Sequence, residues 1–119
     1  LAALFDYARE QAELQTRDYG FRTLLGTYQF VVFDPWTNEW KIAEEDDALR
    51  ERRIPEGLMP GLVVEGRRVV LESRWPKIDD HKPQVLIFGN GDLSYFEWRL
   101  RREGTGQEAV ILSDGGPVP

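Results

Sequence analysis

Few side chains in this 119-residue sequence have the types and spacing needed for catalysis. His81 is the only histidine, and it lies in a polar stretch beside Asp79, Asp80 and Lys82. A nucleophilic triad needs a histidine as its general base, and a zinc site needs three or four His, Cys or carboxylate ligands. The sequence contains no cysteine. A single histidine among charged neighbours is typical of a solvated loop, so we predict no catalytic residue, no metal site and no cofactor, and we do not expect an enzyme.

Two other segments have the composition of a ligand-binding loop but not its pattern. Residues 44–47, Glu-Glu-Asp-Asp, could offer carboxylates to Ca²⁺, but the alternating ligands and central glycine of an EF-hand loop are absent. We interpret them as a solvated acidic loop that pairs with nearby arginines (Arg50, Arg52 and Arg53). Gly89-Asn90-Gly91 has the glycines of a phosphate cradle, but a strand is predicted after it, whereas a cradle needs the N-terminus of a helix. We interpret it as a turn.

The aromatic residues leave one binding function open. Trp36, Trp40 and Trp75 lie in or near predicted loops, where exposed indoles could stack on sugar rings, as in a carbohydrate-binding β-sandwich. Such residues more often cover the edge of a core or contact a protein partner. The net charge of −6, from interspersed acidic and basic residues, argues against nucleic acid or anionic lipid as a partner. No apolar run approaches the ~20 residues that a membrane-spanning helix requires.

The element expected to organise the domain is a helix over residues 1–17, LAALFDYAREQAELQTR. It contains no Gly or Pro, and Tyr19-Gly20 is predicted to end it. At ~100° per residue, one apolar face forms, and we expect this face to pack on the domain's own sheet. Its residues are Leu1, Leu4, Phe5, Ala8 and Ala12. A narrower stripe of Ala3, Tyr7 and Leu14 is left for a second partner. The helix begins without a capping residue, so we expect it to continue upstream of Leu1.

The rest of the chain reads as short antiparallel strands. They are expected at residues 21–25, 27–33, 39–42, 58–64, 68–71, 84–88, 95–101 and 108–112. Glu65-Gly66 is predicted to form a hairpin turn, and Phe96, Trp98 and Leu100 are predicted to point inward. Residues 74–83 contain two prolines and are expected to form a mobile loop. These elements predict an α+β fold in which an N-terminal helix packs on antiparallel, sandwich-like sheets of about seven or eight strands.

The order of these segments resembles the minor pseudopilin H family of type II secretion systems. The matching pieces are LAALFDYAREQAELQTRDYGFR, YQFVVFD, LRERRIPEGL and PQVLIFGNGDLSYFEWRL, and the first and last are the most specific. The resemblance implies one periplasmic domain over residues 1–119. Within it, residues 1–17 would be the lower part of a pilin-type helix, residues 20–114 the β domain and residues 115–119 a tail. It also implies a single-pass anchor upstream of residue 1, in the bacterial inner membrane.

The same resemblance implies a structural role and a set of partners. Such proteins assemble into a pseudopilus that helps secrete folded proteins across the outer membrane. The implied partners are other minor pseudopilins (I, J and K type), the major pseudopilin and the inner-membrane secretion platform, with no nucleic acid. We expect Ala3, Tyr7 and Leu14 to meet neighbouring pseudopilin helices. The alternatives are a minor pilin of a type IV pilus, the carbohydrate-binding module, and an enzyme using His81.

Overall fold

The computed structural model describes residues 2–112, so Leu1 and residues 113–119 lie outside the described part. Helix α1 (Ala2–Gln15) comes first, and one turn of 3-10 helix, η1 (Asp47–Leu49), follows later in the chain. The described strands are β1 (Tyr19–Thr23), β2 (Thr27–Asp34), β3 (Glu39–Ile42), β4 (Arg52–Arg53), β5 (Leu58–Val64), β6 (Arg67–Val69), β7 (Val85–Ile87), β8 (Phe96–Arg102) and β9 (Glu108–Leu112).

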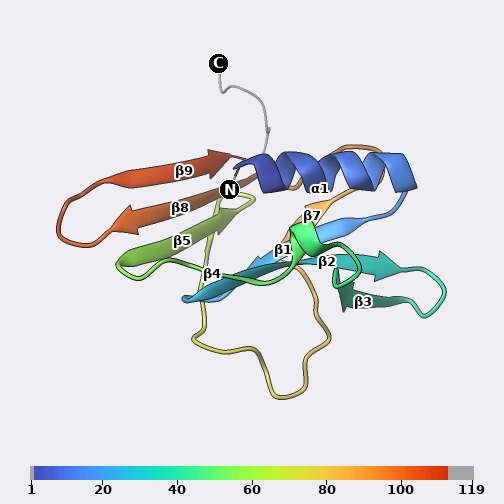
Figure 1. The fold of residues 1–119 in the computed structure, drawn as a ribbon, viewed down its shortest axis with the longest axis horizontal. Coiled ribbons are helices and arrows are strands. Elements are labelled where there is room, and N and C mark those ends of the chain that lie inside the picture. Colours follow the sequence, from blue (N-terminus) through green and yellow to red (C-terminus); the bar gives the residue numbers. More distant parts are fainter. Residues whose placement is uncertain (1, 113–119) are drawn as a thin grey trace.

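These strands form two antiparallel sheets, and α1 packs against both of them (Figure 1). The first sheet has the order β3-β2-β1-β7, with β4 added beside β2, and the second has the order β6-β5-β8-β9. The predicted α+β class is therefore confirmed. The described residues form nine strands, whereas about seven or eight were expected. The additional strand is β4, which pairs through only two residues and is too short to leave a pattern in the sequence.

The core lies where α1 meets the two sheets. The ring of Phe5 is 4.7 Å from that of Phe21 in β1, 5.4 Å from that of Phe30 in β2 and 5.0 Å from that of Phe96 in β8, measured between centroids. Ala8 and Ala12 follow on the same helix face and are fully buried. Because their side chains are small, the backbone of α1 can approach the sheets closely at these two positions.

Several local predictions are confirmed by the strands. Phe96, Trp98 and Leu100 alternate inward along β8 and are buried. Glu65 and Gly66 join β5 to β6 with φ angles of 52° and 77°, the left-handed pair that a tight hairpin turn requires. Residues 74–83 form neither helix nor strand, as predicted. Their mobility stays a prediction.

The predicted end of the helix is wrong. α1 ends at Gln15, and Thr16 takes the left-handed conformation with φ of 52°. The Arg17 N–H then donates to the Ala12 carbonyl at 3.1 Å, which closes the helix in a Schellman-type arrangement without a glycine. Gly20 lies inside β1 instead, so this first strand begins at Tyr19 and not at Phe21.

Gly20 is needed for close packing and not for a turn. A Cβ atom at Gly20 would lie 2.4 Å from Cβ of Pro83, which approaches from the segment leading into β7. Only a residue without a side chain fits between the two. Among residues 2–112, no helix is both long enough and apolar enough to cross a membrane.

We expect Phe5→Ala to lower the free energy of unfolding by about 3–5 kcal/mol, because it empties the position where α1 meets both sheets. Leu14→Ala, on the exposed side of the same helix, should change that free energy by no more than about 0.5 kcal/mol. Urea unfolding followed by circular dichroism measures both. Equal effects of the two substitutions would contradict this account of the core.

Gly20→Ala should destabilise the protein by about 1–3 kcal/mol, because the added methyl group overlaps Pro83. Gly26→Ala is the matched control, since nothing lies within 4 Å of the position that its Cβ would take. The same urea titration compares them. A Gly20→Ala variant as stable as the Gly26→Ala variant would show that Pro83 can move aside freely.

Candidate functional site

The side of α1 that faces away from the sheets is the first candidate surface. Ala3 is exposed, and the Leu14 side chain is 71% exposed near the C-terminal end of the helix. Tyr7 lies between them, half-buried, and its hydroxyl donates to Oδ2 of Asp46 at 2.7 Å. Of the expected packing face, Phe5, Ala8 and Ala12 are buried and Leu4 is half-buried, whereas Leu1 lies outside the described residues. The two stripes are therefore on different sides of one helix.

The exposed side of α1 also carries acidic residues in succession. Asp6, Glu10 and Glu13 are all exposed. Asp6 and Glu10 are four residues apart, so their like charges face each other and disfavour the helix by a few tenths of a kcal/mol. In the described part of the chain, the one ion pair made by these three carboxylates is Arg9 to Glu13, at 3.9 Å. The surface is therefore suited electrostatically to a basic partner.

The turn at residues 89–91 holds the C-terminal half of α1 in place. Arg9 Nε donates to the Gly91 carbonyl at 2.7 Å, and the Gly89 N–H donates to Oδ1 of Asp18 at 2.9 Å. A Cβ at Gly89 would lie 3.0 Å from the Arg17 nitrogen, so the turn touches the helix end directly. The chain then runs through a bridge at Leu93 into β8, and no helix follows. The interpretation as a turn, and not a phosphate cradle, is thus supported.

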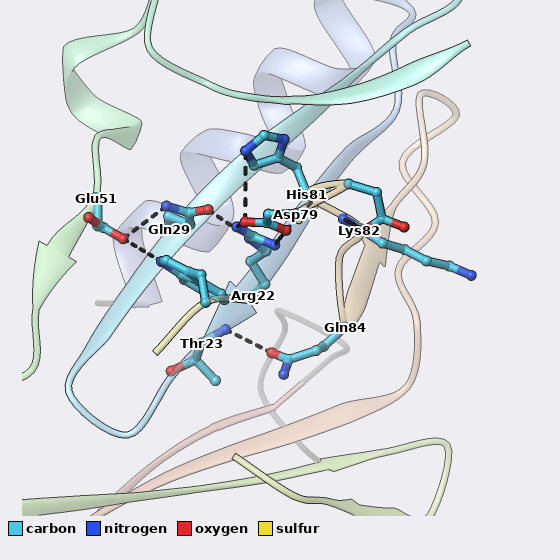
Figure 2. A network of polar contacts seen from close by, with 10 residues as sticks. Arg22, Thr23, Gln29, Glu51, Asp79, His81, Lys82 and Gln84 are labelled. Carbon is cyan, nitrogen blue, oxygen red and sulfur yellow. Dashed lines mark hydrogen bonds and ion pairs between the residues drawn. The ribbon is translucent and has the colours of Figure 1, made fainter. Parts of the chain in front are cut away.

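A second cluster surrounds Arg22 at the centre of the first sheet (Figure 2). Arg22 is only 4% exposed. Its Nε donates to Oε1 of Gln29 at 2.6 Å, and its two Nη atoms donate to the two carboxylate oxygens of Asp79. The guanidinium carbon lies 3.8 Å from the ring centre of Trp75. A cation stacked and paired in this way holds residues 75–79 against β1.

The network continues to both sides of Arg22. Glu51 accepts a hydrogen bond from Gln29 Nε2 at 2.9 Å (Figure 2). It accepts a second from Trp75 Nε1 at 3.0 Å. On the other side, the backbone N–H of His81 donates to Oδ1 of Asp79 at 2.9 Å. The Arg22 guanidinium lowers the pKa of Asp79 from 3.8 to about 2, so this carboxylate stays ionised and structural.

His81 itself has none of the contacts of a catalytic base. Its Nε2 lies 3.8 Å from Oδ2 of Asp79, and this carboxylate already binds Arg22 through both oxygens. In the described residues, no hydroxyl side chain is hydrogen-bonded to the imidazole. Sequence reasoning singled out His81 but missed Arg22, Gln29 and Glu51. The only available signal was a charged residue inside a segment predicted to be a strand.

The other chemically suggestive residues are dispersed. Trp36 is 93% exposed between β2 and β3, Trp40 packs edge-to-face on Phe33 at 5.2 Å, and Trp75 stacks with Arg22. No two of these three indoles stack on each other in the part of the chain described, so they do not form the paired platform expected of a sugar site. In the acidic run, Asp46 caps η1 by accepting the Ala48 N–H at 3.0 Å. Residues 2–112 contain no group of three or more potential metal ligands.

Ionisation of Asp79 should make the stability of the protein depend on pH in acid. Because its folded-state pKa is depressed, its contribution is complete above pH 4 and is lost as the pH falls through about 2. The shift corresponds to about 2 kcal/mol. We expect Asp79→Asn to be less stable than the wild type at pH 7 and to lose less stability between pH 5 and pH 2.

Asp80→Asn is the control for this experiment, because Asp80 binds only a backbone N–H, that of Lys82, at 3.0 Å. Urea unfolding at several pH values gives the free energy of unfolding for each variant. Parallel pH profiles for the wild type and Asp79→Asn would contradict the role assigned to the Arg22–Asp79 pair.

No protein-family model matches the chain. It is 30% identical over 120 residues to the type II secretion system protein H of Pseudomonas aeruginosa, an alignment that covers 98% of this chain and 67% of that protein.

Solved structures with the same fold come from two other bacteria. A crystal structure of the minor pseudopilin EpsH from the type II secretion system of Vibrio cholerae has a TM-score of 0.73 at 15% identity, covering 94% of this chain and 91% of that one. The solution structure of Escherichia coli GspH has a TM-score of 0.61 at 20% identity, and the match covers 93% of this chain and 77% of that one.

Proposed function

Because this chain belongs to the family of type II secretion minor pseudopilins of the H type, we propose that it is a structural subunit of a pseudopilus and joins its neighbours through α1. The proteins that it resembles in sequence and in fold belong to type II secretion systems. The alternative of a type IV pilus minor pilin is therefore not favoured. Assembly with other pseudopilins is the activity that this family membership implies.

The observation that carries the proposal is the two-sided character of α1. Phe5, Ala8 and Ala12 attach the helix to the sheets, and Ala3 and Leu14 stay exposed on the other side. A leucine that is 71% exposed beside the carboxylates of Glu10 and Glu13 adds little to the isolated fold. It gains a role when a second helix covers it and supplies basic side chains. Tyr7 adds only the exposed part of its ring, because the ring also packs against the core and its hydroxyl is bound to Asp46.

We infer the remaining organisation from the family and from the direction of α1. In this scheme α1 forms the lower part of a longer helix, and residues 19–112 form the head. The anchor crosses the inner membrane once and places this domain in the periplasm. The proposed neighbours are the I, J and K minor pseudopilins, the major pseudopilin and the secretion platform. The protein performs no catalysis in this scheme.

Leu14→Glu should weaken assembly without unfolding the domain. The added charge lies next to Glu10 and Glu13 and removes the apolar contact offered to a neighbouring helix. We expect secretion to fall at least several-fold when this variant replaces the wild-type gene in its own host. Crosslinking to other pseudopilins should fall in parallel, and the chain contains no cysteine that would interfere with single-cysteine crosslinking at Ala3.

Val70→Glu is the matched control, since Val70 is 80% exposed and lies in the segment after β6, away from α1. It makes the same chemical change on another surface and should leave secretion intact. Normal secretion and crosslinking by Leu14→Glu would overturn the assignment of this face of α1. Loss of thermal stability in Leu14→Glu would show that the residue acts within the monomer.

A further inference from the structure

The outer face of the second sheet is a surface that neither the core nor the proposed role of α1 uses. Phe96 and Trp98 are buried on the inner side of β8, and alternation along the strand turns Arg99 and Arg101 to the opposite side. β5 runs beside β8, with Gly61 paired to Arg99 (Figure 1). A partner bound to this face therefore does not compete with one bound to α1.

A hollow of about 640 Å³ lies on this face and is lined by residues of β5, β6 and β8. Gly61, in the middle of β5, belongs to the lining, and nothing lies within 4 Å of the position that a Cβ would take there. Met59 and Val63 lie on the same side of the strand, and Met59 is 45% exposed. A glycine inside a strand is typical of a place where a ligand or another backbone approaches closely.

A second hollow, of about 380 Å³, extends the first toward the turn that joins β8 to β9. Met59 and Arg101 line both hollows, and Gly104 and Gly106 line the far end. The two hollows therefore form one open groove along β5 and β8, which we call the β5–β8 groove. A long, open groove suits an extended polypeptide better than a compact ligand.

The ionic contacts within the groove leave two arginines free. Arg99 is paired with Glu97 at 2.7 Å and with Glu108, so both carboxylates of the first hollow are engaged. Arg68 and Arg101 are exposed, and neither makes an ion pair within residues 2–112. Four arginines and three glutamates line the groove in total, so its charge is +1 on a chain whose net charge is −6.

The two free guanidinium groups are placed to hold one bound chain at two points. Arg68 of β6 is opposite Val63 in the strand register. Arg101 of β8 is opposite Met59, so Gly61 lies between the two arginines along β5. A backbone that passes over Gly61 can offer one carboxylate to each arginine, and each pair can be bidentate. We propose that the β5–β8 groove binds an extended, acidic segment of another protein.

Charge and shape together favour this partner over other anionic ones. Nucleic acid and anionic membranes carry dense negative charge, which the net charge of −6 repels and which two free arginines do not balance. A short acidic segment needs only these two arginines, and its main chain can lie on Met59 and Gly61. The groove contains no residue of α1, so this contact can be absent while the proposed role of α1 stands.

Fluorescence anisotropy of a labelled peptide, titrated with the 119-residue protein, tests the proposal. The probe alternates glutamate and valine, so it favours an extended backbone and carries its carboxylates on one side. We expect saturable binding, and none for the same peptide with glutamine at every glutamate. Arg68→Gln and Arg101→Gln should each raise the dissociation constant about fivefold, because each removes one partly exposed ion pair. Gly61→Leu, which fills the hollow and changes no charge, should weaken binding at least as much.

Arg74→Gln is the matched control and should leave the affinity unchanged, because Arg74 is exposed and lines neither hollow. Equal weakening by Arg74→Gln would show attraction by overall charge and overturn the proposal. Undiminished binding by Gly61→Leu would place the peptide elsewhere, and a wild type that does not bind the glutamate peptide would also overturn it. Concentration-dependent dimers that Arg101→Gln abolishes would assign the groove to a second copy instead. Equal unfolding temperatures of the four variants exclude misfolding as the cause.

Discussion

Burial of the Phe5 ring between two sheets fixes the orientation of α1 relative to every strand. The ring touches β1, β2 and β8 at once, so the helix cannot rotate without separating aromatic side chains that come from both sheets. Once Phe5 points inward, the helical period places Ala8 and Ala12 inward as well. The same period leaves Ala3 and Leu14 outside. The surface that we assign to assembly is therefore a consequence of how the core is packed.

Close backbone contacts complete the attachment of the helix, and they explain two glycines whose roles differ from ordinary turn formation. Gly89 lies against Thr16 and Arg17 at the end of α1, and Gly20 lies against Pro83. Both bring segments distant in sequence to within van der Waals contact of a backbone. The PQVLIFGNGDLSYFEWRL segment thus contains both a buried strand and the turn that supports the helix.

Much of the fold could be predicted because it rests on local periodicity. The apolar faces of α1, the alternation in β8 and the Glu65-Gly66 turn each follow from neighbouring residues. The parts that could not be predicted depend on distant partners. Arg22 meets Gln29, Asp79 and Glu51 through the tertiary fold, β4 exists because Thr27 pairs with Arg53, and Gly20 is required because Pro83 approaches it. No local pattern contains this information, and this is why the sequence alone predicts a helix stop at Gly20.

The polar groups that suggested chemistry are already engaged in structural contacts. Asp79 neutralises a buried arginine, Asp46 caps η1 and binds Tyr7, and Trp75 covers the Arg22 guanidinium. Removing one partner of such a network leaves a buried charge or donor unsatisfied, so these residues are constrained by folding. What the domain leaves free is surface: the outer face of α1, the indole of Trp36 and the hollow above Gly61. These surfaces face different directions, which is the distribution that our proposed assembly with other pseudopilins requires.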